Sequence, residues 1–119
     1  MLNRVLLYAK DVERTVRFYE KFFGFVSLRL DGDRIVELVN PMGGARLMVH
    51  AASKGQRQGQ TLVKLVFDVE DVEAFSERCR VDGLDFGKVH HAEGYRFANA
   101  KDPANNPVSI SSRAFRGSV

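Results

Sequence analysis

The stretches KDVERTVRFYEKFFGF (10–25) and VEDVEAFSERCRVDGL (69–84) decide the fold, because they are two versions of one pattern. Asp11 and Asp71 each precede an amphipathic run, and an aspartate there can accept a free N–H of the first helical turn. We therefore expect two capped helices related by an offset of 60 residues. Chance similarity between two amphipathic helices is the alternative to a true internal repeat.

Each predicted helix carries an apolar stripe and ends at a glycine. The stripes consist of Val12, Val16, Tyr19 and Phe23 in the first helix and Val72, Phe75 and Cys79 in the second. A spacing of three to four residues places such side chains on one face, which is typical of a core-facing helix. Gly24 and Gly83 stand where a left-handed residue ends a helix. We expect Cys79 to be a buried, unreactive thiol.

Strand-like runs surround each helix in the same order. RVLLYA precedes the first helix and LVKLVFDV the second; the runs that follow are FVSLRL, RIVELV and ARLMVH, then LDFGKVHH, GYRFANA and PVSISS. Asp31-Gly32-Asp33 suits a tight hairpin turn. The sequence thus predicts an α+β fold of two βαβββ modules in one domain over residues 1–119. Module one spans 1–52, a polar linker 53–60, and module two 61–119.

Composition narrows the classes of function. The chain of 119 residues is 45% hydrophobic and 28% charged, as expected for one globular domain. The net charge of +3 comes from mixed-sign helices without basic runs, which argues against nucleic-acid binding. One cysteine excludes an intrachain disulfide and fits a reducing cytoplasm. We expect neither a signal peptide nor a membrane span.

The two helical stretches, together with GYRFANAKDPANNPVSI (94–110), resemble the vicinal oxygen chelate superfamily. This superfamily includes glyoxalase I, extradiol dioxygenases, fosfomycin-resistance transferases and bleomycin-resistance proteins. The resemblance implies a curved mixed sheet that forms a cup, with the helices on its outer face. It also implies two modules that face each other, either within one chain or across a homodimer.

The resemblance places the metal-ligand positions of the superfamily on residues that bind metals poorly. These positions fall on Arg4, Lys64 and Ser109, and a fourth, used by some members, on Met48 or His50. Arginine and protonated lysine have no lone pair for a cation, and serine is a weak neutral ligand. We therefore expect no metal at the usual site and no cofactor.

Strand alternation gives a set of candidate ligand-binding residues on the inner face. The set is Arg4, Tyr8, Met48, His50, Lys64, Arg96, Ser109 and Ser111. A basic floor with hydroxyl groups and an apolar wall suits a carboxylate, phosphate or enolate group. The alternative is that Arg4 and Lys64 merely pair with Asp68 or Glu37 and hold the sheet together.

His50 and Tyr95 are the candidate catalytic residues, because each can move a proton. Of Tyr95 and Arg96, we expect Arg96 to face inward, provided that Phe97 packs under the helix. His90 and His91 are adjacent in a predicted strand segment and should point to opposite faces. A replacement metal site built from His50, Glu37 and one of this pair stays open.

These observations favour a metal-independent binder of a small anionic or neutral molecule, of the resistance or metabolite-binding type. The alternative is a lyase, isomerase or dioxygenase of the same superfamily, either metal-free or using a non-standard metal site. An interaction protein without a pocket is a further class, disfavoured by the mixed polar and apolar strand faces. We expect a homodimer, because a single half-cup exposes strand edges and an apolar wall.

Overall fold

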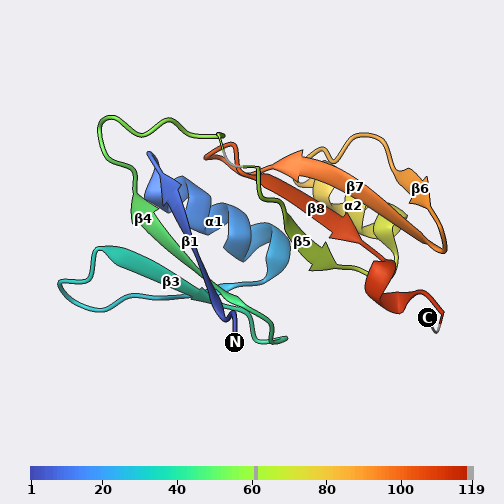
Figure 1. The fold of residues 1–119 in the computed structure, drawn as a ribbon, viewed down its shortest axis with the longest axis horizontal. Coiled ribbons are helices and arrows are strands. Elements are labelled where there is room, and N and C mark those ends of the chain that lie inside the picture. The colour runs from blue at the N-terminus through green and yellow to red at the C-terminus, as the bar shows by residue number, and fades with distance from the viewer. Residues whose placement is uncertain (61, 118–119) are drawn as a thin grey trace. The chain divides into compact units, whose positions relative to one another are not determined.

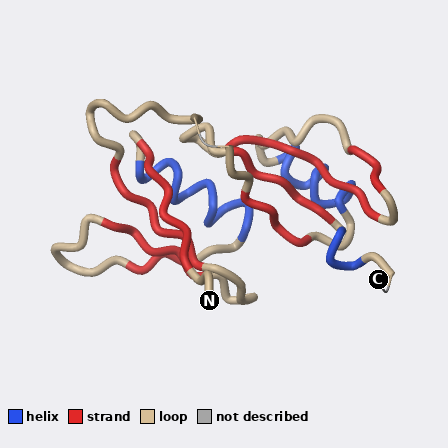
Figure 2. The backbone as a smooth tube through the Cα atoms, viewed as in Figure 1, coloured by secondary structure: helices blue, strands red, loops and turns tan. Residues whose placement is uncertain are grey.

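The computed structural model describes residues 1–60 and 62–117, and both repeats are visible in it (Figure 1). The first repeat forms β1 (Arg4–Ala9), α1 (Val12–Phe23), β2 (Val26–Leu28), β3 (Ile35–Val39) and β4 (Arg46–Ala51). The second forms β5 (Leu65–Asp68), α2 (Val72–Val81), β6 (His90–Ala92), β7 (Tyr95–Lys101) and β8 (Pro107–Ser111), followed by the 3₁₀ helix η1 (Arg113–Phe115). Figure 2 shows the same path by secondary structure.

Two four-stranded mixed sheets have the same topology. The first has the strand order β1-β4-β3-β2 and the second β5-β8-β7-β6. In each sheet the strand before the helix pairs in parallel with the last strand of its module, and the other pairs are antiparallel. The predicted α+β fold of two βαβββ modules is therefore confirmed. Of the predicted strand LDFGKVHH only the two histidines lie in a strand, because Gly87 (φ 67°) interrupts the run.

The helix termini form as the sequence predicts. The Asp11 carboxylate accepts the Arg14 N–H at 3.0 Å, and the Asp71 carboxylate accepts the Ala74 N–H at 3.0 Å. Gly24 ends α1 with φ 73°, a left-handed conformation that costs glycine little. The C-cap of α2 is Asp82, one residue before the predicted Gly83. Gly83 follows it in a left-handed conformation.

One face of each sheet is buried under its helix. In the first unit the buried side chains are Leu7, Ala9, Val36, Leu38, Leu47 and Val49 on the sheet, with Val16, Phe18 and Tyr19 on α1. In the second they are Ala98, Val108 and Ile110, with Val72 and Cys79 on α2. Cys79 is buried as predicted, and burial raises the pKa of its thiol, so its reactive thiolate is disfavoured. The opposite, open face of each sheet carries the predicted site residues except Arg96, which contacts Glu73 of α2.

The chain divides into two compact units that do not follow the repeat alone. Met1–Gln60 and the turn Asp102–Asn105 form the first unit, and the other described residues form the second. Thr61, Ser118 and Val119, which the predicted second module includes, lie outside the described residues. No helix in the described part of the chain is long and apolar enough to cross a membrane.

The turn Asp102–Asn105 is anchored to α1 within the first unit. The Tyr19 hydroxyl donates to Asp102 Oδ2 at 2.6 Å, and Asp102 Oδ1 accepts the Ala104 N–H at 2.8 Å. Burial, together with the Asp102 carboxylate, raises the pKa of Tyr19 well above its usual range, so the phenol keeps its proton. Asn105 adopts the predicted left-handed conformation, with φ 64°.

Candidate functional site

The open face of the first sheet brings four predicted site residues together. Arg4 and Tyr8 of β1 lie on the face away from α1, since the intervening Leu7 is buried. The register pairs Tyr8 with His50, and Met48 lies two residues before His50 on the same face of β4. Alternation and register thus place these four side chains on one face of the first sheet, and their role in binding a ligand stays a prediction.

Arg4 does not stand free on this face. Its Nε donates to Glu37 Oε1 at 2.8 Å, and Nη1 of Arg46 lies 3.3 Å from the same oxygen. The hydrogen bond from Arg4, followed by that from Arg46, lowers the pKa of the Glu37 carboxyl. The alternative in which Arg4 pairs with Glu37 is thus what the structure shows, and the carboxylate occupies part of the hydrogen-bonding capacity of Arg4.

His50 has a defined hydrogen bond and an aromatic neighbour. Its Nδ1 lies 2.7 Å from the Ala51 carbonyl oxygen, and since a carbonyl only accepts, Nδ1 carries the proton. In the neutral ring the lone pair is then on Nε2. The Tyr8 and His50 rings meet edge to face, with centroids 5.7 Å apart. This arrangement leaves His50 able to accept a proton at Nε2.

The open face of the second sheet holds the equivalent positions with different chemistry. Lys64 Nζ donates to Asn99 Oδ1 at 2.9 Å, and Asn99 pairs with Ser109 across β7 and β8. In the first sheet Glu37 pairs with Met48 in the same way, so Lys64–Asn99 is the repeat counterpart of Arg4–Glu37. Within the described residues no carboxylate forms an ion pair with Lys64.

The two predicted serines are more buried than the neighbouring lysine. Ser109 is 3% exposed and Ser111 5% exposed. The Ser109 hydroxyl donates to the Ala98 carbonyl at 3.1 Å, and Ser111 Oγ accepts the Arg113 N–H at 3.1 Å. Each hydroxyl thus has a hydrogen-bond partner in its own unit. Ser109 is a small, buried side chain whose hydroxyl is already hydrogen-bonded within the sheet.

An aromatic row lies along the same open face, and we call it the His90–Phe97–Tyr95 row. His90 and Phe97 stack with centroids 5.0 Å apart, and Tyr95 and Phe97 lie 6.1 Å apart. Arg113 lies 5.2 Å from the centroid of the Tyr95 ring and donates to its hydroxyl at 3.2 Å. Sequence reasoning missed Phe97, Asn99 and Arg113; the alternation Tyr95, Phe97, Asn99 along β7 was the signal that locates the first two.

The expected orientation of Arg96 is wrong. Arg96 Nη1 contacts Glu73 Oε1 of α2 at 2.5 Å, so Arg96 lies on the helix side of the sheet. Phe97 takes the open face instead of packing under the helix, and strand alternation then places Tyr95 on the open face as well. His91, which pairs with Arg96 in the register, shares the helix side, and His90 the open face, as the adjacency of the two histidines predicted.

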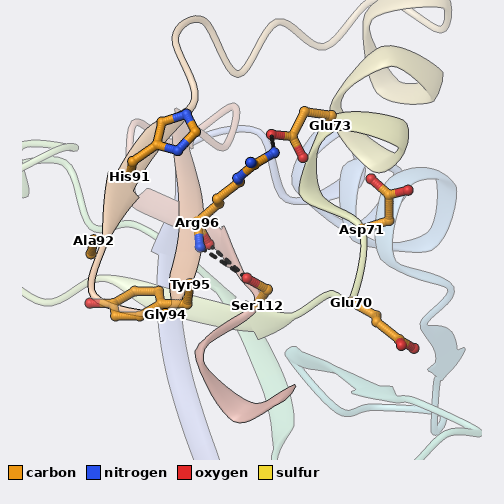
Figure 3. A pocket seen from close by; sticks show the side chains of 9 residues that line it. All are labelled: Glu70, Asp71, Glu73, His91, Ala92, Gly94, Tyr95, Arg96 and Ser112. Atoms are coloured by element: carbon orange, nitrogen blue, oxygen red, sulfur yellow. Dashed lines mark hydrogen bonds and ion pairs between the residues drawn. The ribbon is translucent and has the colours of Figure 1, made fainter. Parts of the chain in front are cut away.

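A shallow hollow lies between the start of α2 and the β6–β7 hairpin (Figure 3). Its volume is about 920 Å³, and its lining includes Glu70, Asp71, Glu73, His91 and Arg96. Asp71 caps α2 and Glu73 holds Arg96, so two of the three carboxylates have structural partners. The hollow is net acidic and does not suit the anionic ligand expected from the sequence.

Among the described residues, no group of three or more His, Cys, Asp or Glu side chains is placed to hold a metal ion. The side chains at the metal-ligand positions implied by the resemblance are hydrogen-bonded to protein groups instead: Arg4 to Glu37, Lys64 to Asn99 and Ser109 to the Ala98 carbonyl.

Comparison with known families and structures adds independent findings. A sequence model of the Glyoxalase/Bleomycin resistance protein/Dioxygenase superfamily matches residues 1–110. A search of curated proteins found no significant match.

Solved structures share the fold at low identity. The antibiotic-binding protein TnmS3 from Streptomyces sp. CB03234 is 18% identical, with a TM-score of 0.77 over 92% of this chain and 93% of that one. A lactoylglutathione lyase from Agrobacterium tumefaciens is 17% identical, with a TM-score of 0.73 over 98% and 96%. A mutant fosfomycin resistance protein from Listeria monocytogenes, in complex with Mn(II) and 1S,2S-dihydroxypropylphosphonic acid, is 16% identical, with a TM-score of 0.69 over 94% and 88%.

Proposed function

The chain belongs to the Glyoxalase/Bleomycin resistance protein/Dioxygenase superfamily, and we propose that it binds a small anionic molecule on the open face of its second sheet without a metal ion. The observation that carries this proposal is the Lys64–Asn99 pair. A lysine ammonium has three donors, and the amide oxygen of Asn99 uses one of them without neutralising its charge. Two donors and a full positive charge are thus available to a carboxylate or phosphate.

The comparison between the repeats supports this choice of face. On the first sheet the Glu37 carboxylate accepts from both Arg4 and Arg46, so Arg4 already has a protein anion at 2.8 Å. On the second sheet the equivalent acceptor is a neutral amide, so the counter-charge is left for a ligand. Charge-assisted hydrogen bonds of this kind are about twice as strong as neutral ones.

The remainder of the face supplies apolar contact. Val66 of the edge strand β5 is exposed, and the register places it beside Ser109 of β8. Small-molecule sites combine apolar surface with a few polar groups that fix orientation. Antibiotic binding by TnmS3 and the phosphonate in the fosfomycin resistance protein are consistent with such a ligand on this fold.

Calorimetric titration with 2-phosphoglycolate, which carries a carboxylate and a phosphate, tests the proposal. We expect Lys64→Gln to weaken binding at least tenfold, about 1.4 kcal/mol. The matched control Lys54→Gln removes the same charge from the first unit and should leave the dissociation constant unchanged. Equal affinity of both variants and the parent protein would refute the role of Lys64.

Elemental analysis separates this proposal from a metal-dependent enzyme. The tag-free protein would be exposed to Zn²⁺, Ni²⁺, Mn²⁺ and Fe²⁺ in turn and then desalted. We expect substoichiometric metal throughout and 2-phosphoglycolate binding that EDTA does not change. One metal per chain would instead favour a lyase or dioxygenase with a non-standard site.

A second candidate function is a metal-free lyase or isomerase on the first sheet. The observation that favours it is the His50 hydrogen bond to the Ala51 carbonyl, which leaves the lone pair on Nε2 beside the Tyr8 ring. A base at Nε2 could accept a proton from a bound substrate. Solvent deuterium exchange into candidate α-hydroxy or α-keto acids, followed by NMR, would detect it. Loss of exchange in His50→Gln is expected, and no exchange by the parent protein would remove this candidate.

A further inference from the structure

We propose a second anion site, separate from Lys64, in which Arg113 and Arg116 bind the carboxylate of an aromatic acid at the Tyr95 end of the His90–Phe97–Tyr95 row. The guanidinium carbon of Arg113 lies 5.2 Å from the centroid of the Tyr95 ring. That of Arg116 lies 5.9 Å from the same centroid. Two cations therefore converge on one aromatic side chain.

The two guanidinium groups lack an anion of their own in the described part of the chain. No carboxylate there forms an ion pair with Arg113 or Arg116, whereas five other ion pairs are present. Like charges held near one ring repel each other, and a ring quadrupole offsets only part of that repulsion. A carboxylate placed between them would relieve it, and a guanidinium can donate two parallel hydrogen bonds to a carboxylate.

The Tyr95 hydroxyl helps to fix the geometry of this cluster. Arg113 Nη1 donates to the phenol oxygen at 3.2 Å, and the backbone N–H of Arg113 donates to Ser111 Oγ at 3.1 Å. These bonds tie η1 to the end of the second sheet and hold one guanidinium in place. A guanidinium held in advance loses less conformational entropy when a ligand binds.

The aromatic row explains why the ligand should carry a ring. Phe97 lies 6.1 Å from Tyr95 and stacks on His90 at 5.0 Å with an interplanar angle of 22°. A row of planar side-chain rings on a sheet face offers a surface on which the ring of a conjugated ligand can stack. The carboxylate would thus lie at the arginines and the ring would extend along the row.

The site is too far from Lys64 for one small ligand to use both. Tyr95 and Asn99 are four residues apart in β7, which corresponds to roughly 13 Å at the rise of a β-strand. The hollow on the helix side, where Arg96 pairs with Glu73, is net acidic and offers no competing anion site. The inference therefore does not depend on the function proposed for Lys64.

Fluorescence titration with 2-naphthoate tests the site, with 2-naphthol as the uncharged ring and acetate as the carboxylate without a ring. We expect 2-naphthoate to bind at least tenfold more tightly than either, and its affinity to fall as salt rises. Arg113→Gln and Arg116→Gln should each weaken binding at least fivefold, and Arg113→Lys should weaken it less than Arg113→Gln. Arg34→Gln, at an exposed arginine of the first unit, should leave the affinity unchanged.

Two results would overturn the inference. If Arg113→Gln and Arg116→Gln both bind 2-naphthoate as tightly as Arg34→Gln does, the two arginines only fasten η1 to β7. Tighter binding of 2-naphthol than of 2-naphthoate would show an apolar site without charge recognition. Titration in the presence of saturating 2-phosphoglycolate keeps the two proposals distinct, since unchanged 2-naphthoate affinity is expected and full competition would mean a single shared site.

Discussion

Replacing Tyr19 by phenylalanine should destabilise the first unit more than any other loss of a single hydroxyl that we consider. Tyr19 is fully buried and Asp102 is 3% exposed, and their hydrogen bond is 2.6 Å long. Hydrogen bonds to charged groups contribute about 1.5–3 kcal/mol, and both partners of this one are buried. We therefore expect Tyr19→Phe to lower the free energy of unfolding by about 2–3 kcal/mol.

Urea denaturation followed by circular dichroism measures this loss, and a double-mutant cycle assigns it. The cycle combines Tyr19→Phe with Asp102→Ala, and we expect a coupling energy of about 1.5–2.5 kcal/mol because the two groups interact directly. Tyr8→Phe is the control, since Tyr8 is 45% exposed, and it should change stability by less than about 0.5 kcal/mol. A coupling energy below about 0.5 kcal/mol would refute the claim that this bond anchors the turn Asp102–Asn105 to α1.

Three further predictions concern the first unit and the assembly. The pKa of Glu37, measured by NMR, should lie below its usual range and rise in Arg4→Gln; because the folded-state pKa is depressed, the stabilisation is present at neutral pH and is lost as the pH falls through that pKa. Gly59→Ala should destabilise the protein by about 1–2 kcal/mol in urea, since Gly59 has φ +78° and a Cβ there would lie 2.8 Å from the Asn105 Cβ. Sedimentation should give twice 13.4 kDa, because Leu6, Val26 and Leu28 are exposed on the open face of the first sheet; a single 13.4 kDa species at high concentration would contradict this.

The sequence predicts the fold well where local chemistry and periodicity agree. Asp11 and Asp71 cap their helices because a short carboxylate next to an amphipathic run has one dominant use. Gly24 ends α1 for an equally local reason. The repeat of these signals was sufficient to infer two modules of the same topology, which the two strand orders confirm.

The site was harder to predict, because it depends on which face each strand residue takes. A shift of one residue in the register of β7 moves Arg96 to the face that Tyr95 now occupies, and Tyr95 to the other face. The local sequence does not decide between these two registers. In the folded chain Ala98 is fully buried on the helix side, so Arg96, two residues before it, lies on that side too and pairs with Glu73 of α2. The arginines of η1 were missed for the same reason, since only the folded chain shows that Arg113 and Arg116 reach the Tyr95 ring.

The divergence of the two repeats gives the most direct test of the proposed binding face. Glu37 and Asn99 occupy equivalent positions, and each accepts a hydrogen bond from the basic residue at the start of its module. Asn99→Asp is nearly isosteric and would recreate on the second sheet the ion pair of the first. At this half-exposed site the new pair should change stability by no more than about 1 kcal/mol. It should nevertheless weaken 2-phosphoglycolate binding at least tenfold, because Lys64 would already have its anion and the new carboxylate would repel the ligand. Affinity equal to that of the parent protein would mean that the ligand does not use the charge of Lys64.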